Sequence, residues 1–278
     1  MADLDKVKML QKKAIEVRKA VLSMIHAAQS GHPGGSLSAA DMMTALYFSE
    51  LNLRPGDPHW DERDRFVLSK GHVCPVLYAC LCLRGYFGHE HLLTLRREGS
   101  LLQGHPDMKR CPGADISTGS LGQGLSVAVG MALRAKRDNM GYRVFVLLGD
   151  GETDEGQIWE AVQSAAKYEL DNLVILVDNN GLQNDGACQD IMPTGNLYRK
   201  FEAFGCECHA IDGHDMADIL DALAAVRADT GKKPHCIVAK TVKGKGVSFM
   251  ENVVAWHGTA PNDAQYAQAI GEIEEGLA

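Results

Sequence analysis

Short, uninterrupted apolar runs recur along the chain, and each is followed by a polar or glycine-rich turn. Residues 144–148 lead into Gly149-Asp150-Gly151, and residues 173–177 lead into Asp178-Asn179-Asn180. A third strong run, 236–240, precedes a turn with two lysines. Runs of this length and composition are typical of strands that are buried on both faces of a parallel sheet.

Helical periodicity separates these runs. Residues 1–28 carry apolar side chains at Leu10, Ala14, Val17, Val21 and Met24, which predicts an amphipathic helix. Ser38, with Asp41 three residues later, predicts the capped start of a helix over 39–51. Further helices are expected at 76–83, 126–137 and 155–168, and a short strand at 66–68. The alternation predicts a doubly wound α/β fold with a mainly parallel sheet flanked by helices, one domain over 1–278 with a helical N-terminal segment.

Composition narrows the class of protein. A formal net charge of -8 argues against a nucleic-acid-binding role that depends on a basic surface. The eight cysteines include no Cys-x-x-Cys pair, which favours core packing in a reducing compartment over a zinc or disulfide framework. The first helix does not resemble a signal peptide, and the apolar runs are too short to cross a membrane. We therefore expect a cytoplasmic protein without membrane or nucleic-acid partners.

Polar side chains follow two neighbouring strands of the predicted sheet. Ligands of open parallel sheets bind outside the carboxyl ends of the strands, where Asp150 and Asn180 would lie close together. Carboxylate and amide oxygens suit a hard divalent cation, which leaves positions open for diphosphate oxygens. The sequence therefore predicts a site for a magnesium diphosphate.

Four histidines lie beside glycine or proline in predicted loops: His32, His72, His105 and His257. Imidazoles around one pocket would serve proton transfer and hydroxyl binding. We expect the other seven to be solvated residues beside turns: His26, His59, His89, His91, His209, His214 and His235. Lys243 and Lys245, in a glycine-rich turn, could contact phosphate, but an exposed basic turn is the favoured interpretation.

Six segments taken in order resemble the transketolase family. They are Ser30 to Gly34, Ser69 to His72, Gly104 to Pro106, Thr118 to Gly124, the motif from Gly149 to Asn180, and Trp256 to Gly258. The resemblance covers about residues 14–262. Within the family, the chain is most similar in kind to the amino-terminal subunit of split transketolases. It implies a thiamine-diphosphate-binding fold, and a subunit that moves a two-carbon ketol unit from a ketose, or ketose phosphate, to an aldose acceptor.

The resemblance also implies a role for each matching position. Asp150, Asn180 and the Leu182 carbonyl would bind Mg2+ or Ca2+. Cofactor contacts would come from His72, Gly119, Ser120, Leu121, Gly151, Asn180 and His257. His32, His105 and His257 would be catalytic residues that surround the donor ketose and help to move protons. Glu155 and Glu160, which we count among the cofactor-binding residues, match acidic residues that lie near the subunit interface in this family.

The family's catalytic glutamate and its sugar-phosphate contacts belong to a second, pyrimidine-binding domain, which we expect to be absent from this chain. The resemblance thus implies a separate pyrimidine-binding partner subunit, in a symmetric α2β2 assembly that acts on sugar phosphates. Alternatives are a ketol transferase for a modified sugar, a deoxyxylulose-phosphate synthase, a split 2-oxo acid dehydrogenase and a non-catalytic binding scaffold.

Overall fold

Five parallel strands form one sheet in the computed structural model, which describes residues 2–276. The strands are β1 (Arg65–Leu68), β2 (Val144–Gly149), β3 (Leu173–Asn179), β4 (Glu207–Asp212) and β5 (His235–Lys240). Their order across the sheet is β1-β2-β3-β5-β4, and every neighbouring pair is parallel. The prediction of a mainly parallel sheet is confirmed, and β4 is an edge strand that the apolar pattern did not identify.

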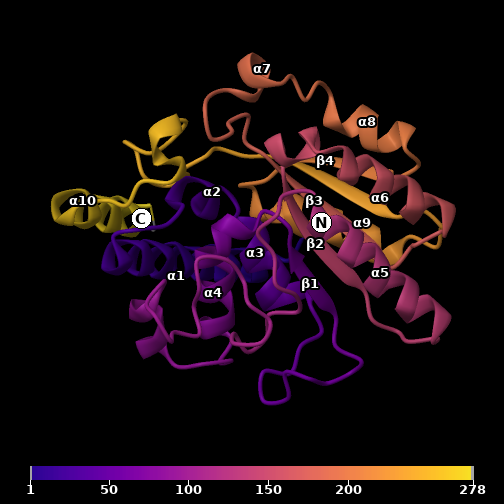
Figure 1. Ribbon diagram of the computed structural model, residues 1–278, viewed down its shortest axis with the longest axis horizontal. Coiled ribbons are helices and arrows are strands. Elements are labelled where there is room, and N and C mark those ends of the chain that lie inside the picture. Colours follow the sequence, from indigo (N-terminus) through magenta and orange to yellow (C-terminus); the bar gives the residue numbers. More distant parts are fainter. Residues whose placement is uncertain (1, 277–278) are drawn as a thin grey trace.

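Helices cover both faces of the sheet, so the doubly wound prediction is also confirmed (Figure 1). One side carries α1 (Leu4–Ala28), α2 (Pro33–Ser38), α3 (Ala40–Ala45), α4 (Cys74–Leu83), α9 (Met216–Ala228) and α10 (Asp263–Glu275). The other carries α5 (Gln123–Arg137), α6 (Gly156–Lys167) and α8 (Leu197–Ala203). A single short helix turn, α7 (Cys188–Ile191), lies in the connection after β3.

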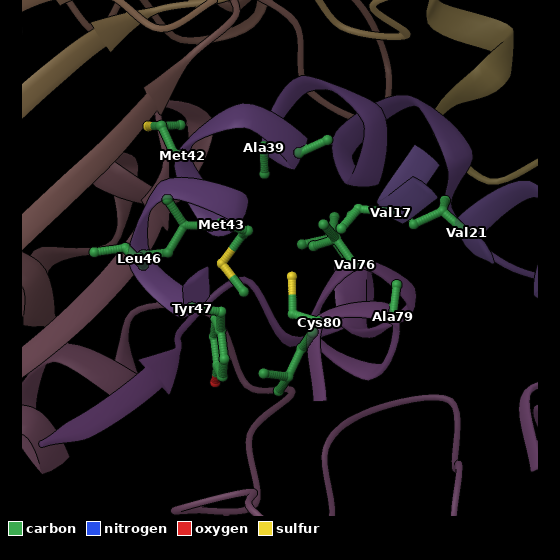
Figure 2. Packing of buried hydrophobic residues seen from close by; sticks show 14 of the residues in the cluster. Val17, Val21, Ala39, Met42, Met43, Leu46, Tyr47, Val76, Ala79 and Cys80 are labelled. Atoms are coloured by element: carbon green, nitrogen blue, oxygen red, sulfur yellow. The ribbon is translucent and has the colours of Figure 1, made fainter. Parts of the chain in front are cut away.

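Alternate residues of each strand point to opposite faces, which divides the core in two. Phe145 and Leu147 of β2 join the first core cluster, under α1, α3, α4 and α9. Val144 and Val146 join the second core cluster, under α5, α6 and α8. Figure 2 shows part of the first core cluster, where side chains of α1, α3 and α4 point toward one another. The two clusters together hold the sheet, and with it the strand ends that carry the site, between the two helical layers.

The predicted helix over 39–51 is confirmed within one residue at each end, but its Ser38 cap and its uniform α-helical winding are wrong. The chain forms α2, then α3, and then a π-helical turn at Leu46–Glu50. Ser38 ends α2 and caps nothing, because its hydroxyl donates to the Gly35 carbonyl at 3.1 Å and to Asp178 at 2.5 Å. A buried carboxylate from another strand therefore uses the hydroxyl that the sequence pattern assigned to a cap.

The remaining expectations about the chain have simple outcomes. All eight cysteines are buried and free, so the packing interpretation is confirmed. No helix within residues 2–276 has both the length and the apolar character needed to cross a bilayer. The acidic segment at the end of the chain forms α10, which begins with a capping box between Asn262 and Gln265.

Candidate active site

A cavity of about 320 Å3 opens where β1, β2 and β3 end. It lies at the carboxyl edge of the sheet, as the strand ends predicted. Seven predicted site residues line it: His72, Leu121, Asp150, Gly151, Asn180, Leu182 and His257. The cavity is also lined by residues that were not predicted as site residues, among them Lys70, Glu152, Gln183 and Lys243.

The turns after β2 and β3 bring the three predicted metal ligands to one wall of this cavity. The Asp150 carboxylate accepts the amides of Gly151, at 2.8 Å, and Gly181, at 2.5 Å. The Asn180 side-chain oxygen accepts the Leu182 amide at 3.0 Å. Burial, and then the neighbouring Asp178, raise the pKa of Asp150. A cation beside this carboxylate would offset both effects.

Beneath the cavity, Asp178 is fully buried in a polar network. It accepts hydrogen bonds from the Lys70 ammonium and from the hydroxyls of Ser38 and Thr241. Although burial opposes ionisation, the Lys70 ammonium lowers the pKa of Asp178. Lys70 and Asp178 therefore form a buried ion pair whose charges largely cancel.

The prediction that Lys243 belongs to an exposed basic turn is wrong. The residue is only 2% exposed, and its Nζ donates to the Leu182 carbonyl at 3.0 Å and to His257 Nδ1 at 2.8 Å. No ion pair to Lys243 is found among residues 2–276. Burial, and then the Lys70 ammonium, lower its pKa to about 8. Asp150 and Asp178 oppose this lowering without forming an ion pair with Lys243, so the cavity wall holds a buried ammonium that an anionic ligand would stabilise.

Three of the four predicted site histidines form a compact cluster. The ring centroids of His32 and His72 lie 5.0 Å apart, those of His72 and His257 5.2 Å, and those of His32 and His257 5.5 Å. Burial is the main cause that lowers their pKa values, with positive neighbours adding to it, to about 4 for His32, 2 for His72 and 3 for His257. All three are neutral at pH 7.

Two of these imidazoles have a defined proton position. The Lys243 ammonium can only donate, so His257 Nδ1 accepts and the ring proton lies on Nε2. The Arg96 guanidinium likewise donates to His32 Nδ1, at 3.4 Å. Both rings therefore present a donor from Nε2.

His105, Gly119 and Ser120 do not line the cavity, although Leu121 of the same loop does. A Cβ added to Gly119 would lie 3.1 Å from His105 Cδ2, so the absence of a side chain allows this approach. Gly119 and Ser120 line a neighbouring hollow. Glu155 and Glu160 are exposed and lie outside both, so their interface role stays a prediction.

The Glu152 carboxylate accepts hydrogen bonds from three segments around the cavity, a role that the sequence did not predict. One carboxylate oxygen accepts the Ser69 hydroxyl at 2.5 Å and the Gly122 amide at 2.9 Å, and the other accepts the Gly149 amide at 3.0 Å. Those donors follow β1, open α5 and end β2. The only sequence signal was an acidic residue directly after Gly149-Asp150-Gly151, which resembles any polar turn.

Two histidines were wrongly expected to be solvated. His235 begins β5 and is 2% exposed. His214 is partly buried and pairs with the Asp41 carboxylate at 2.8 Å. His235 directly precedes the apolar run 236–240, which could have marked it as internal, whereas His214 lies in a polar turn.

An all-parallel sheet whose carboxyl edge combines oxygen donors, a buried cation and neutral imidazoles defines a cofactor-dependent α/β enzyme of the diphosphate-binding class. The profile of one family, described as "Transketolase, thiamine diphosphate binding domain", matches residues 10–272. The chain belongs to the transketolase family.

Relatives of matching length are named as transketolase subunits. A 6-deoxy-6-sulfo-D-fructose transketolase subunit from a Clostridium species is 45% identical over 96% of both chains. An apulose-4-phosphate transketolase subunit from Phocaeicola vulgatus is 41% identical over 97% of this chain and 95% of that one. The resemblance to amino-terminal subunits of split transketolases is thereby confirmed.

Longer transketolases match this chain over less than half of their own length. Human transketolase is 40% identical over 98% of this chain but only 43% of its own length. The crystal structure of Campylobacter jejuni transketolase superimposes with a TM-score of 0.91 at 34% identity, over 96% of this chain and 43% of that one. The thiamine-diphosphate-binding fold predicted from the sequence is confirmed.

Proposed function

We propose that this chain binds the diphosphate of thiamine diphosphate in a transketolase whose active site is completed by a separate pyrimidine-binding subunit. The observation that carries the proposal is Lys243, a buried ammonium without an ion-pair partner among residues 2–276, on the wall that also carries Asp150 and Asn180. A diphosphate would supply the missing anion, and a divalent cation would balance the carboxylate.

The donor set on this wall fits Mg2+ or Ca2+. Asp150, Asn180 and the Leu182 carbonyl offer only oxygen, the ligand that both cations prefer. Among residues 2–276 no cluster of three histidine, cysteine, aspartate or glutamate side chains exists to bind a softer metal. In this proposal the three oxygens hold the cation, while Gly151, Asn180 and the Lys243 ammonium contact the diphosphate.

The histidines are proposed to handle the sugar and the rest of the cofactor. Bound thiamine diphosphate supplies the carbon nucleophile that adds to the ketose carbonyl and accepts the electrons of the broken carbon-carbon bond. His32 and His257 donate hydrogen bonds from Nε2 to sugar hydroxyls, and His105 joins them at the donor ketose. His72 and the segment Gly119 to Leu121 hold the cofactor. Neutral imidazoles suit this work, since each has one ring nitrogen that donates a hydrogen bond and one that accepts a hydrogen bond.

The substrate is proposed to be a ketose with an anionic group, such as a sugar phosphate or a sulfonated sugar. The names of the similar proteins support this class, since one is named for a sulfofructose and others for apulose 4-phosphate. Proteins with such names and lengths also support a partner subunit, which we propose to be present twice, in a cytoplasmic α2β2 assembly.

A reconstitution experiment tests the proposal. Ketol transfer from xylulose 5-phosphate, and from a sulfonated ketose, to ribose 5-phosphate is measured with this chain alone, with its candidate partner alone and with both. Activity only in the mixture, dependent on thiamine diphosphate and Mg2+, is the expected result. Full activity of the single chain would overturn the two-subunit proposal, and failure of the mixture to bind thiamine diphosphate would overturn the cofactor site.

A further inference from the structure

A second group of polar side chains lies outside the cofactor cavity and lines a separate hollow of about 510 Å3. Arg18 of α1 forms a bidentate ion pair with Asp41 of α3, with distances of 2.9 Å from Nη1 to Oδ1 and 2.6 Å from Nη2 to Oδ2. His214, which follows β4, contacts the same carboxylate, with Nδ1 2.8 Å from Oδ2. The side chains of Arg18, Asp41 and His214 are 8%, 10% and 13% exposed. None of them lines the cofactor cavity.

The outer ends of this group hold the segment that carries Lys243. The Val242 amide donates to His214 Nε2 at 2.8 Å, and Arg18 Nε donates to the Lys245 carbonyl at 3.3 Å. The backbone is thus held one residue before Lys243 and two residues after it. Gly244, with a φ of 82° and its amide bonded to the Gly34 carbonyl, lets the chain turn between these points.

The protonation state of His214 follows from its partners. A backbone amide can only donate, so Nε2 must accept from Val242 and the ring proton must lie on Nδ1. That proton points at the Asp41 carboxylate. Burial opposes ionisation of Asp41, but the Arg18 guanidinium and the His214 hydrogen bond lower its pKa to about 2, so it accepts as a carboxylate.

We propose that Arg18, Asp41 and His214 are positioning residues that hold the 242–245 segment so that the Lys243 ammonium faces the cofactor cavity. The proposal deepens the function proposed above, because it assigns a support to the residue that would meet the diphosphate. Lys243 needs such a support: a long side chain with an unpaired charge gains hydration whenever it turns outward. Fixing the backbone on both sides reduces the orientations that the side chain can reach.

Two substitutions separate the halves of the His214 interaction. His214→Gln keeps an acceptor near the position of Nε2 but loses the donor at Nδ1. His214→Asn keeps a donor near Nδ1 but loses the acceptor for Val242. We expect His214→Asn to weaken thiamine diphosphate binding by the complex of both subunits about tenfold or more, in the range seen for residues that orient ligands, and His214→Gln to weaken it less.

His26→Asn is the matched control. His26 Nε2 lies 2.8 Å from Asp263 Oδ1, so this variant also breaks a histidine-aspartate pair, but far from the 242–245 segment. Its affinity for thiamine diphosphate should match that of the unchanged protein. Equal loss in His26→Asn and His214→Asn would mean that the effect is general destabilisation, and would overturn the proposal.

Two measurements do not depend on cofactor binding, and the first of them needs no variant. Nitrogen chemical shifts of 15N-labelled histidine should place the His214 proton on Nδ1, and a proton on Nε2 would overturn the proposal. Hydrogen exchange at the Val242 amide should be slow in the unsubstituted chain, and in His214→Asn it should become faster. If thiamine diphosphate failed to bind at all, the function proposed above would fail while these results still decided the positioning role.

Discussion

Lys243 is a charged residue that is buried and that also lines the proposed cofactor cavity. Its ammonium is buried beside Leu182 and His257, without a carboxylate partner within residues 2–276. A buried charge of this kind costs free energy in the unliganded protein. The cost is tolerable where the ligand that removes it is itself an anion.

Removing this charge should separate cofactor affinity from stability. We expect Lys243→Met to weaken thiamine diphosphate binding about 10- to 100-fold, from the loss of one or two charge-assisted hydrogen bonds worth about 1.5–3 kcal/mol. The free energy of unfolding should not fall, because an unpaired buried ammonium is replaced by an apolar side chain of similar length. Titration calorimetry and denaturant unfolding measure the two quantities. Lys240→Met, at an exposed lysine of β5, is the control, and an equal affinity loss there would contradict the assignment.

The lowered pKa of Lys243 gives cofactor binding a defined pH dependence. With a pKa of about 8, the side chain is largely charged at pH 7 and largely neutral at pH 9. A bound diphosphate raises that pKa, so binding above pH 8 takes up a proton, and affinity falls as the pH rises through this range. Calorimetry at pH 8.5 in two buffers of different ionisation enthalpy measures the uptake. Lys243→Met should abolish it, and an uptake that persists in that variant would come from another group.

At the level of elements, apolar runs and turn residues predicted β1, β2, β3, β5 and most of the long helices, because these segments are buried on one or both faces. The edge strand β4 was missed, since only Cys208 and Ile211 of its six residues are buried, and their spacing of three does not fit the period of two of a half-buried strand. The helix over 39–51 was predicted to begin at a Ser38 cap because a local pattern cannot reveal that Ser38 lies within α2 and donates to Asp178 of β3.

The same limit applies to the site. Asp150, Asn180 and His72 lie next to turns that mark strand ends, so their position follows from the sequence pattern. Lys243 and Glu152 lie in similar polar turns, but their burial depends on segments distant in the chain. The spacing of apolar residues along the sequence indicates the type of an element. It does not indicate which distant segments pack over a turn and bury its side chains.

Glu152 connects the ends of β1 and β2 with the start of α5, so its effect belongs to these elements together. A glutamine offers one acceptor oxygen and one donor group where three donors converge, so Glu152→Gln should lower the free energy of unfolding by about 1–3 kcal/mol. Hydrogen exchange at Gly122 should become faster, and thiamine diphosphate should bind more weakly. Asp154→Asn, in the same turn but exposed, is the control. Unchanged exchange at Gly122 in Glu152→Gln would contradict this role.

For the whole molecule, the proposed assembly makes a prediction about mass. The chain of 30.1 kDa should form a species with its pyrimidine-binding partner that contains two copies of each subunit. Native mass spectrometry with thiamine diphosphate and Mg2+ present measures the stoichiometry. A one-to-one complex with full ketol-transfer activity would contradict the paired arrangement.

The buried thiols give this molecule internal reporters of how it opens. Cys74, Cys80 and Cys111 belong to the first core cluster, whereas Cys206 and Cys236 belong to the second. Burial raises the pKa of each of these five thiols, so none reacts readily with an alkylating reagent while the fold is closed. Mass spectrometry after timed alkylation would therefore record the opening rate of each face of the sheet separately. Equal rates would mean that the sheet and both helical layers open as one cooperative unit, and unequal rates would identify the face that opens first.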